Sequence, residues 1–355
     1  MLAVIDTGLV TTKAAAMVGS SILEASYPSS VVRGLVGEQA GGIYCIGKTP
    51  ANFQFYSVLS QPYGLIPVSG QHFREPTSTQ RRVLIEHALD KLGLKGKADV
   101  ILTQPAPSLF AGGEDLTGRL REAEAALLKM PVSAIEGSGR PSAPSWKLNQ
   151  VTASVEAVWG LYDLAISSGA AAQDDLSEFT SNRVRVGATV AVVDFGATGT
   201  RVHYVEWTGE LLPTLVMTRY HESTYGTEAV IAQIDARLID RHGYRDVIDL
   251  PQLRTHPVII VAGAKVDVAD LVKDSVQAAA DLILAAGFNQ LREEVSSGAV
   301  DHVLCVGGGA HVFASLIADS VPADAILTAT DPCMAPVRGL LKVRSVSLGT
   351  GGGRS

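Results

Sequence analysis

The sequence is poor in cysteine and in charge, and both shortages narrow what the protein can be. The cysteines, Cys45, Cys305 and Cys333, lie far apart without C-x-x-C spacing, so the sequence indicates neither a zinc site nor a disulfide framework. Charged residues make up only 18% of the 355 residues, against 46% hydrophobic ones. That balance is typical of a compact folded protein and excludes a disordered one.

The chain also lacks a basic excess and a long apolar run. The formal net charge is −7, whereas wrapping nucleic acid requires a basic face, so we expect any role with DNA to run through a partner. No stretch approaches the roughly eighteen consecutive apolar residues of a membrane span, and the N-terminus shows no basic region or cleavage site. We therefore expect a cytoplasmic protein that contacts neither a membrane nor nucleic acid directly.

An internal repeat is the strongest feature of the sequence. A short apolar strand ends in DTG at residues 6–8, and a second apolar strand ends in DFG at residues 194–196; another strand follows each tripeptide. These units predict two equivalent hairpins, each opening one half of the chain. The segment SSGAAAQDDLSEFTSN, residues 167–182, is a break in composition that separates the halves.

The predicted organisation is an α/β fold of two related domains, since 355 residues are enough for two separate cores. The first domain covers residues 1–168 with a small inserted subdomain at about 31–72. The second covers 183–344 with an insertion at about 243–298, and residues 345–355 form a flexible tail.

Apolar periodicity predicts the elements between these landmarks. The expected helices cover about 79–92, 114–128, 156–166, 225–241, 311–319, and 266–296, the last either as two helices or as one interrupted near Gly287. The expected strands include 99–103, 151–155 and 303–306, with a strand or hairpin over 256–265.

The two Asp-x-Gly turns suit phosphate binding. A glycine directly after a strand lets backbone N–H groups approach phosphate oxygens, and the carboxylate positions Mg²⁺ through water. One such turn also fits an ordinary hairpin, but two equivalent copies indicate two phosphate-binding hairpins. The candidate residues are Asp6, Gly8, Thr11 and Thr12 in the first turn and Asp194, Gly196, Thr198, Gly199 and Thr200 in the second, with Asp6 and Asp194 as the Mg²⁺ residues.

Two further features extend this candidate site. Lys13 follows the first turn and can meet the β- or γ-phosphate as a point charge, although its position suits a solvated strand lysine equally well. A buried strand ends in Gly307-Gly308-Gly309, a turn that lets a flat ring or a sugar lie against bare backbone, or simply makes a tight crossover. Because Val312 stands where G-x-G-x-x-G needs its last glycine, a Rossmann dehydrogenase is disfavoured.

In this order and spacing, the three glycine turns resemble the phosphate-1, phosphate-2 and adenosine motifs of the actin superfamily. Further segments resemble its ParM/StbA branch, namely HALDKLGLKGKADVILTQPAP, STYGTEAVIAQIDARL and MAPVRGLL. The resemblance implies the actin-like fold, a duplicated ribonuclease H-like fold with a nucleotide cleft between two domains that each carry a small inserted subdomain.

The resemblance also implies a function and partners. A ParM-type protein is expected to bind ATP or ADP with Mg²⁺, to polymerise with itself, and to hydrolyse ATP so that its filaments disassemble. It is expected to segregate plasmid DNA through a DNA-bound adaptor of the ParR type. The sequence leaves ATP and GTP undistinguished, and the alternatives are a small-molecule kinase of the same superfamily and a non-segregating actin-like scaffold.

By the same resemblance, particular residues receive roles. Asp194 is expected to hold the Mg²⁺ water shell, with similar work from Asp6, and Glu156 in ASVEAVWGLY is expected to position the attacking water. A shifted alignment gives that role to Gln150, and Glu156 also suits a carboxylate favoured by a helix N-terminus. The nucleoside contacts implied by analogy are Thr224, Gly226 and Glu228 near the ribose and Gly339 over the adenine.

Overall fold

The computed structural model describes residues 1–19, 21–35, 40–47, 52–60, 78–104, 114–135, 141–167, 172–216, 221–243 and 250–350. The chain divides into two compact α/β units. Unit 1 comprises Met1–Ala172 and Pro336–Ser355, and unit 2 comprises Gln173–Ala335.

Unit 1 contains two five-stranded sheets, ordered β10-β7-β1-β2-β3 and β4-β6-β5-β8-β9. Its strands are β1 (Leu2–Thr7), β2 (Thr11–Val18), β3 (Ser21–Pro28), β4 (Val31–Arg33), β5 (Ala40–Ile46), β6 (Gln54–Leu59), β7 (Gly96–Gln104), β8 (Val132–Ile135), β9 (Pro141–Ser142) and β10 (Trp146–Val155). Its described helices are α2 (Thr79–Lys91), α4 (Glu114–Leu128), α5 (Gly160–Ala165) and, from residue 336 onward, α12 (Ala335–Thr350).

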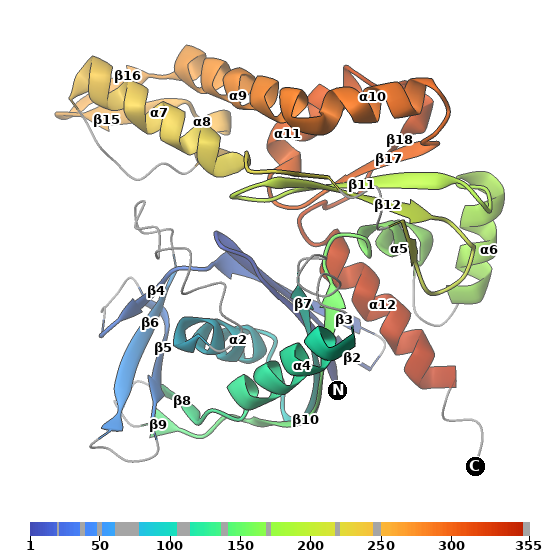
Figure 1. Ribbon diagram of the computed structural model, residues 1–355. Helices are drawn as coiled ribbons and strands as arrows, with labels where there is room; N and C mark the ends of the chain where they lie inside the picture. The colour runs from blue at the N-terminus through green and yellow to red at the C-terminus, as the bar shows by residue number, and fades with distance from the viewer. Residues whose placement is uncertain are drawn as a thin grey trace. The chain divides into compact units, whose positions relative to one another are not determined.

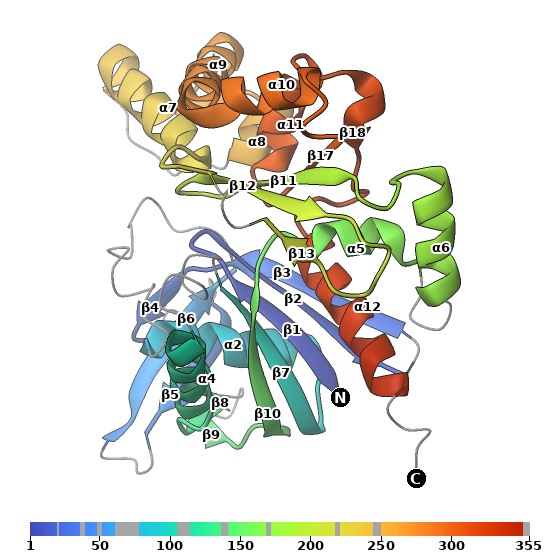
Figure 2. The ribbon, with the colours of Figure 1, turned by 45° about the vertical axis from the view of Figure 1, so that its right-hand side comes forward.

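The first sheet of unit 1 brings three strand ends to one edge. β1 and β2 form the expected antiparallel hairpin, while β1 pairs parallel with β7 and β7 parallel with β10 (Figure 2). Parallel strands have their carboxyl ends at the same edge. The turn after β1 therefore lies at the same edge as the residues that follow β7 and β10.

Helix α2 is buried on two sides, between the two sheets of unit 1 (Figure 1). One side packs Ile85, Ala88 and Leu89 into the core of the first sheet, and the other packs Val83 and Leu84 against the second. In the sequence, the spacing of Ile85, Ala88 and Leu92 indicates only one buried face. The second face was not visible because polar side chains of α2, such as Arg82 and Glu86, are buried along with the apolar ones.

Unit 2 contains one six-stranded sheet, ordered β13-β12-β11-β17-β18 with β14 pairing to β12, and a separate β15-β16 hairpin. Its strands are β11 (Thr189–Phe195), β12 (Thr200–Glu206), β13 (Thr214–Leu215), β14 (His221–Ser223), β15 (Val258–Val261), β16 (Ala264–Asp267), β17 (His302–Val306) and β18 (Ile326–Leu327). Its helices are α6 (Ala172–Asn182), α7 (Thr227–His242), α8 (Leu250–Thr255), α9 (Ala269–Ile283), α10 (Asn289–Ser296) and α11 (Ala310–Ala318), with a π-helical turn at Leu284–Phe288 and a 3-10 turn at Ala323–Ala325.

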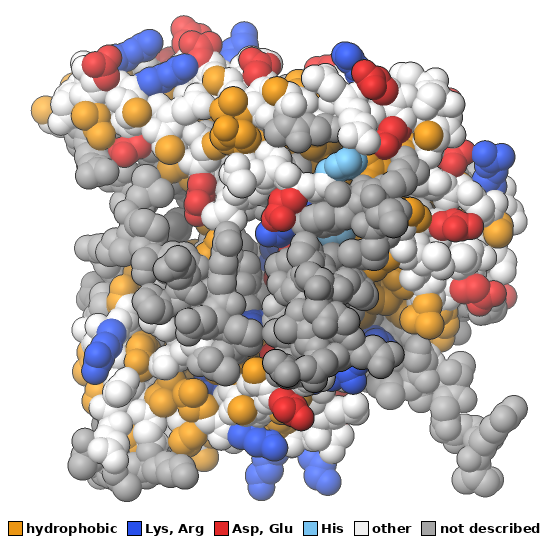
Figure 3. Space-filling model, in the orientation of Figure 1, with side chains coloured by type: hydrophobic (Ala, Val, Ile, Leu, Met, Phe, Trp, Pro, Cys, Tyr) orange, Lys and Arg blue, Asp and Glu red, His pale blue; other side chains and the backbone are white. Residues whose placement is uncertain are grey.

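The core of unit 2 lies between one sheet face and its helices. Ala191, Val193 and Phe195 of β11 pack with Phe288 and Phe313 in a single apolar cluster that includes residues of α7, α9 and α11. The predicted interruption near Gly287 is confirmed, because α9 and α10 are joined by the π-helical turn. On the face shown in Figure 3, acidic and basic side chains are interspersed along the helices of this unit.

Three sequence expectations differ from the structure. The helix expected at 156–166 begins only at Gly160, because β10 extends to Val155 and a turn follows it. The tail expected at 345–355 is helical to Thr350, and residues 351–355 lie outside the described part. The second domain ends at Ala335 and not at residue 344, because α12 packs into unit 1.

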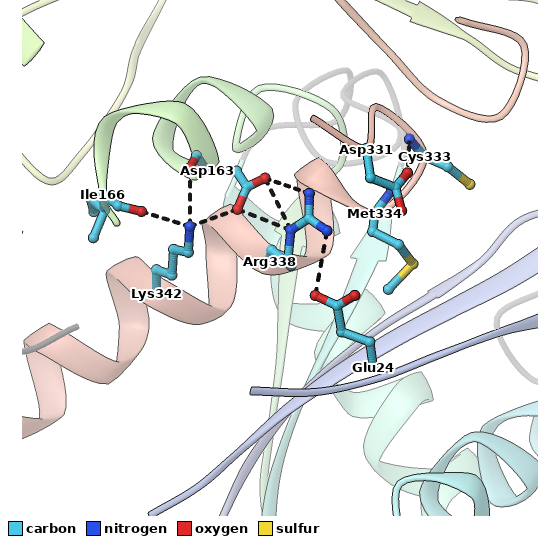
Figure 4. A network of polar contacts seen from close by, with 8 residues as sticks. All are labelled: Glu24, Asp163, Ile166, Asp331, Cys333, Met334, Arg338 and Lys342. Atoms are coloured by element: carbon cyan, nitrogen blue, oxygen red, sulfur yellow. Dashed lines mark hydrogen bonds and ion pairs between the residues drawn. The ribbon is translucent and has the colours of Figure 1, made fainter. Parts of the chain in front are cut away.

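Polar contacts fix α12 to unit 1 (Figure 4). Arg338 donates from Nε and Nη2 to the carboxylate of Asp163 at 2.8–3.1 Å, and its Nη1 lies 3.5 Å from Glu24. The Lys342 ammonium lies 2.8 Å from the same Asp163 carboxylate and donates to the carbonyl of Ile166.

Among the described helices, none combines the length and apolar character needed to cross a membrane.

Candidate functional site

The first hairpin turn carries a close carboxylate–ammonium pair. Asp6 and Lys13 are opposite each other in the β1–β2 ladder, and Lys13 Nζ lies 3.1 Å from Asp6 Oδ2. Both side chains are mostly buried, so Lys13 is not a solvated strand lysine. A Cβ added to Gly8 would lie 2.7 Å from the carbonyl oxygen of Thr11, which explains why the turn requires glycine there.

The second turn repeats this geometry in unit 2. Asp194 is opposite Arg201 in the β11–β12 ladder, with Arg201 Nη1 at 3.8 Å from Asp194 Oδ2. A Cβ on Gly196 would lie 2.9 Å from the carbonyl oxygen of Gly199. The amide of Gly196 donates to the carbonyl of Gly199 at 2.9 Å and closes the turn.

Unit 2 gathers two more of the predicted segments around this turn. The amides of Thr227 and Glu228, in the first turn of α7, donate to the carbonyls of Gly196 and Ala197 at 3.2 and 2.9 Å. A Cβ on Gly226 would collide with the same carbonyls. The α7 N-terminus is therefore packed directly on the second hairpin, with Gly226 and Glu228 beside it.

The glycine turn after β17 also lies against β11. Gly307 has a φ of 88° and a Cβ there would collide with the Asp194 carboxylate, while Gly309 donates to the carbonyl of Phe195 at 2.8 Å. Around a Cβ at Gly308 there is no other atom within 4 Å. Unit 2 thus presents bare backbone at Gly308 next to the second Asp-x-Gly turn.

The predicted threonines divide into two pairs. Thr12 and Thr200 are buried, and their hydroxyls bond Ser29 Oγ at 2.8 Å and the carbonyl of Tyr225 at 2.9 Å. These two hydroxyls brace the hairpins. Thr11 and Thr198 are half-buried at the turns themselves.

The strand register distinguishes the two candidates for positioning water. Gln150 is exposed and shares a row with Asp99, toward the amino ends of β1 and β7. Glu156 follows the carboxyl end of β10, at the edge of the first turn, and its amide donates to the carbonyl of Gln104 at 2.9 Å. The register therefore places Glu156, and not Gln150, at the edge of the sheet that carries the first turn.

The backbone around Glu156 is unusual. Helix α5 begins only at Gly160, so Glu156 lies outside its first turn, which weakens the alternative of a helix-dipole carboxylate. The next residue, Ala157, is buried and has a φ of 67°, a conformation that costs a non-glycine residue about 1 kcal/mol or more.

A buried charged cluster under the first turn was missed by the sequence analysis. Arg81 of α2 donates to Thr7 Oγ1 at 3.0 Å and lies 3.4 Å from the carboxylate of Glu124, which also accepts from Gln104 Nε2. Burial lowers the pKa of Arg81, while the negative charges of Glu124, Asp6 and, less strongly, Glu156 raise it. Burial raises the pKa of Glu124 to about 7, although Arg81 and Gln104 hold it down.

No sequence pattern marks this cluster, because Arg81 and Glu124 occupy helical positions where charged residues are ordinarily solvated. Arg201 was missed for a different reason. Its offset from Asp194 equals that of Lys13 from Asp6, so the repeat itself contained the signal.

Gly339, expected over the adenine, has a packing role in unit 1. It lies in α12, where a Cβ would collide with the carbonyl oxygen of Trp159 at the start of α5. This contact alone explains a glycine at that position. Its adenine contact remains an expectation.

Both turns fit a Mg²⁺–nucleotide. Mg²⁺ usually keeps several waters and binds through one or two carboxylates plus phosphate oxygens of the nucleotide. Asp194 and Asp6, each beside a glycine turn, can provide such a carboxylate. Among the described residues, no group of three or more His, Cys, Asp or Glu side chains could hold a metal by itself.

Comparison with solved structures identifies the fold. The archaeal actin homologue Ta0583 matches with a TM-score of 0.72 and 14% identity over 98% of this chain and 99% of that one. The fold is actin-like. A 15-stranded ParM filament from Clostridium botulinum matches with a TM-score of 0.69 and 12% identity, covering 99% of each chain.

A third actin-like match is ParM from Bacillus thuringiensis with AMPPNP, which has a TM-score of 0.63 and 14% identity over 98% of each chain. Ta0583 has also been solved in complex with ADP. No protein-family profile and no curated protein matches the sequence. At these identities the matches establish the actin-like fold, and the chemistry must be argued from this chain's own residues.

Proposed function

We propose that this actin-like protein is a Mg²⁺-dependent ATPase whose homopolymeric filaments disassemble after hydrolysis. The observation that carries the proposal is the repeated turn, in which an aspartate at a strand end, a sterically required glycine and a cross-strand cation occur in both units. Nucleotide complexes and a filament among proteins of this fold give it support.

Each residue has a defined task in this proposal. Bound Mg²⁺ neutralises the phosphate charge, and Asp194 and Asp6 orient its water ligands. Turn amides and Lys13 bind phosphate oxygens, and Glu156 orients the attacking water. Phosphoryl transfer depends mainly on position and charge, so these tasks are sufficient for hydrolysis.

The test of catalysis compares matched aspartates and glutamates. Asp194→Asn should abolish phosphate release from ATP while Asp240→Asn, at an exposed position of α7, leaves it unchanged. Glu156→Ala should slow release and prolong the life of polymers, whereas Glu122→Ala, exposed on α4, should do neither. Normal turnover by a folded Asp194→Asn chain would remove the site assignment.

Polymerisation is tested by high-speed pelleting with Mg-ATP, Mg-ADP or no nucleotide, followed by negative-stain microscopy of the pellet. Filaments that require ATP support the proposal. Phosphate release without polymer under any nucleotide would contradict it and support the alternative of a small-molecule kinase, which would then need an acceptor.

We further propose that the filaments segregate plasmid DNA from the cytoplasm of the cell through a DNA-bound adaptor of the ParR type, on the basis of the likeness to ParM structures. A low-copy plasmid carrying the gene and its flanking DNA should be lost faster with Asp194→Asn than with the wild-type protein. Equal retention would leave the non-segregating scaffold as the better account.

A further inference from the structure

Arg201 occupies in unit 2 the place that Lys13 occupies in unit 1. In the β1–β2 ladder Lys13 is opposite Asp6, and in the β11–β12 ladder Arg201 is opposite Asp194. In each hairpin the cation thus lies on the strand after the turn, directly opposite the aspartate on the strand before it. The repeat has kept the positive charge and changed the residue type.

The guanidinium of Arg201 is held at the turn. Arg201 Nε donates to Glu222 Oε1 at 2.9 Å, and Glu222 is its partner in the β12–β14 ladder. Arg201 Nη1 lies 3.8 Å from Asp194 Oδ2, too far for a normal hydrogen bond. Its side chain is only 16% exposed, so the charge is kept close to the aspartate rather than spread into solvent.

A cation beside each aspartate reduces the electrostatic repulsion between that carboxylate and a bound phosphate. A carboxylate next to a phosphate chain repels it unless cations lie nearby, and the repulsion grows as water is excluded. In unit 1 the ammonium of Lys13 balances Asp6 directly, at 3.1 Å. In unit 2 the guanidinium of Arg201 lies 3.8 Å from Asp194 and is oriented by Glu222, so the positive charge stands beside the turn where a phosphate would lie.

We propose that Arg201 is a phosphate-binding residue, whose guanidinium contacts the phosphate chain of ATP while Glu222 holds it in position. This proposal rests on the ATPase function proposed above. A planar guanidinium presents several N–H donors in one fork and binds phosphate oxygens bidentately, which a lysine cannot do. The turn of unit 2 would then meet phosphate with a planar guanidinium, where the turn of unit 1 carries the point charge of an ammonium.

The test measures binding of a fluorescent ATP analogue to the whole protein. Charge-assisted hydrogen bonds contribute about 1.5–3 kcal/mol, so Arg201→Gln should weaken binding about tenfold to a hundredfold. Arg201→Lys keeps the positive charge but loses the planar guanidinium, so its affinity for the ATP analogue should lie between those of the wild type and Arg201→Gln. Arg185→Gln, which removes a surface arginine paired with Asp301 in the same unit, should bind as the wild type does.

Two further measurements separate a phosphate contact from a merely structural role. The melting temperature of Arg201→Gln without nucleotide gives the cost of losing its contacts with Glu222 and Asp194, and from that baseline the rise caused by ATP should be lost. The loss of affinity should persist for Mg²⁺-free ATP in EDTA; if it disappears there, Arg201 acts only through Asp194 and the metal, and the proposal is wrong.

The affinities of the wild type and Arg201→Gln together separate a failure of this proposal from a failure of the proposed ATPase function. Wild-type affinity in Arg201→Gln, with an active wild-type ATPase, would overturn the role of Arg201 and leave the proposed function standing. A wild-type chain that binds no ATP would overturn both. Glu222→Gln should weaken binding less than Arg201→Gln, because the cation remains but loses its support.

Discussion

Replacing Gly339 by alanine should destabilise the protein whether or not nucleotide is present. The added Cβ would overlap the Trp159 carbonyl oxygen and lie 2.8 Å from the backbone nitrogen of Asp163. Both neighbours are backbone atoms of α5, so no side-chain rotation can relieve the contact and α12 must move. Overpacking costs about 1–3 kcal/mol, and we expect the upper value because the ion pairs of Arg338 and Lys342 with Asp163 also fix α12.

Thermal unfolding without nucleotide measures this cost. A loss of about 3 kcal/mol lowers Tm by roughly 6–12 °C in a unit of this size. The matched control is Gly118→Ala in α4, where a Cβ would meet no atom within 4 Å and should add about 0.5–1 kcal/mol of stability. An unchanged Tm in Gly339→Ala together with weaker ATP binding would refute the packing argument and favour the adenine contact.

Three further changes test buried charges. Because burial raises the pKa of Glu124 from 4.5 to about 7, its stabilising contribution is full below pH 4.5 and is lost as pH rises through 7. As pH rises from 4.5 to 7, the free energy of unfolding of Glu124→Gln, measured in urea, should therefore increase by about 3 kcal/mol relative to that of the wild type. For the exposed Glu122→Gln, the difference in unfolding free energy from the wild type should not change with pH. Burial lowers the pKa of His87 from 6.5 to about 4, so its contribution is full above pH 6.5 and is lost as pH falls through 4; His87→Gln should lose less stability than wild type on acidification over that range, measured in the same way. Asp163→Asn leaves two mostly buried cations without their carboxylate and should cost about 3–5 kcal/mol in denaturant unfolding, and a loss below 1 kcal/mol would contradict the proposed anchoring of α12.

The duplication, and with it the resemblance to the actin superfamily, was visible in the sequence because each copy of the repeat is short-range and chemically specific. A strand that ends in Asp-x-Gly must turn, and two such strands far apart in one chain indicate a duplication. Helices with one exposed side, such as α4 and α7, were also predicted close to their observed ends. In each case the determining contacts lie within a few residues of one another.

The sequence could not predict contacts made across long separations. Helix α12 packs into unit 1 through the ion pair of Arg338 with Asp163. These residues are 175 positions apart, and no local sequence pattern predicts that they pair. The same holds for Arg81 and Glu124, whose burial depends on how α2 and α4 pack. The beginning of α5 was misplaced because a buried, left-handed Ala157 ends the β10 segment without a glycine or proline to mark it.

Comparing the two turns shows what the duplication has kept and what it has changed. Gly8 and Gly196 are fixed by steric contact with a carbonyl across the turn, so any side chain there would open the hairpin. The cation opposite each aspartate has no such steric constraint and only its charge is common to both copies. The two copies differ at this unconstrained position, with Lys13 in one and Arg201 in the other. If both cations bind phosphate, the two residues are not equivalent, since an ammonium tolerates many approaches and a guanidinium favours one plane. Exchanging the two residues, as Lys13→Arg with Arg201→Lys, should therefore preserve net charge yet weaken ATP binding; affinity equal to the wild type would mean that charge alone matters at both turns.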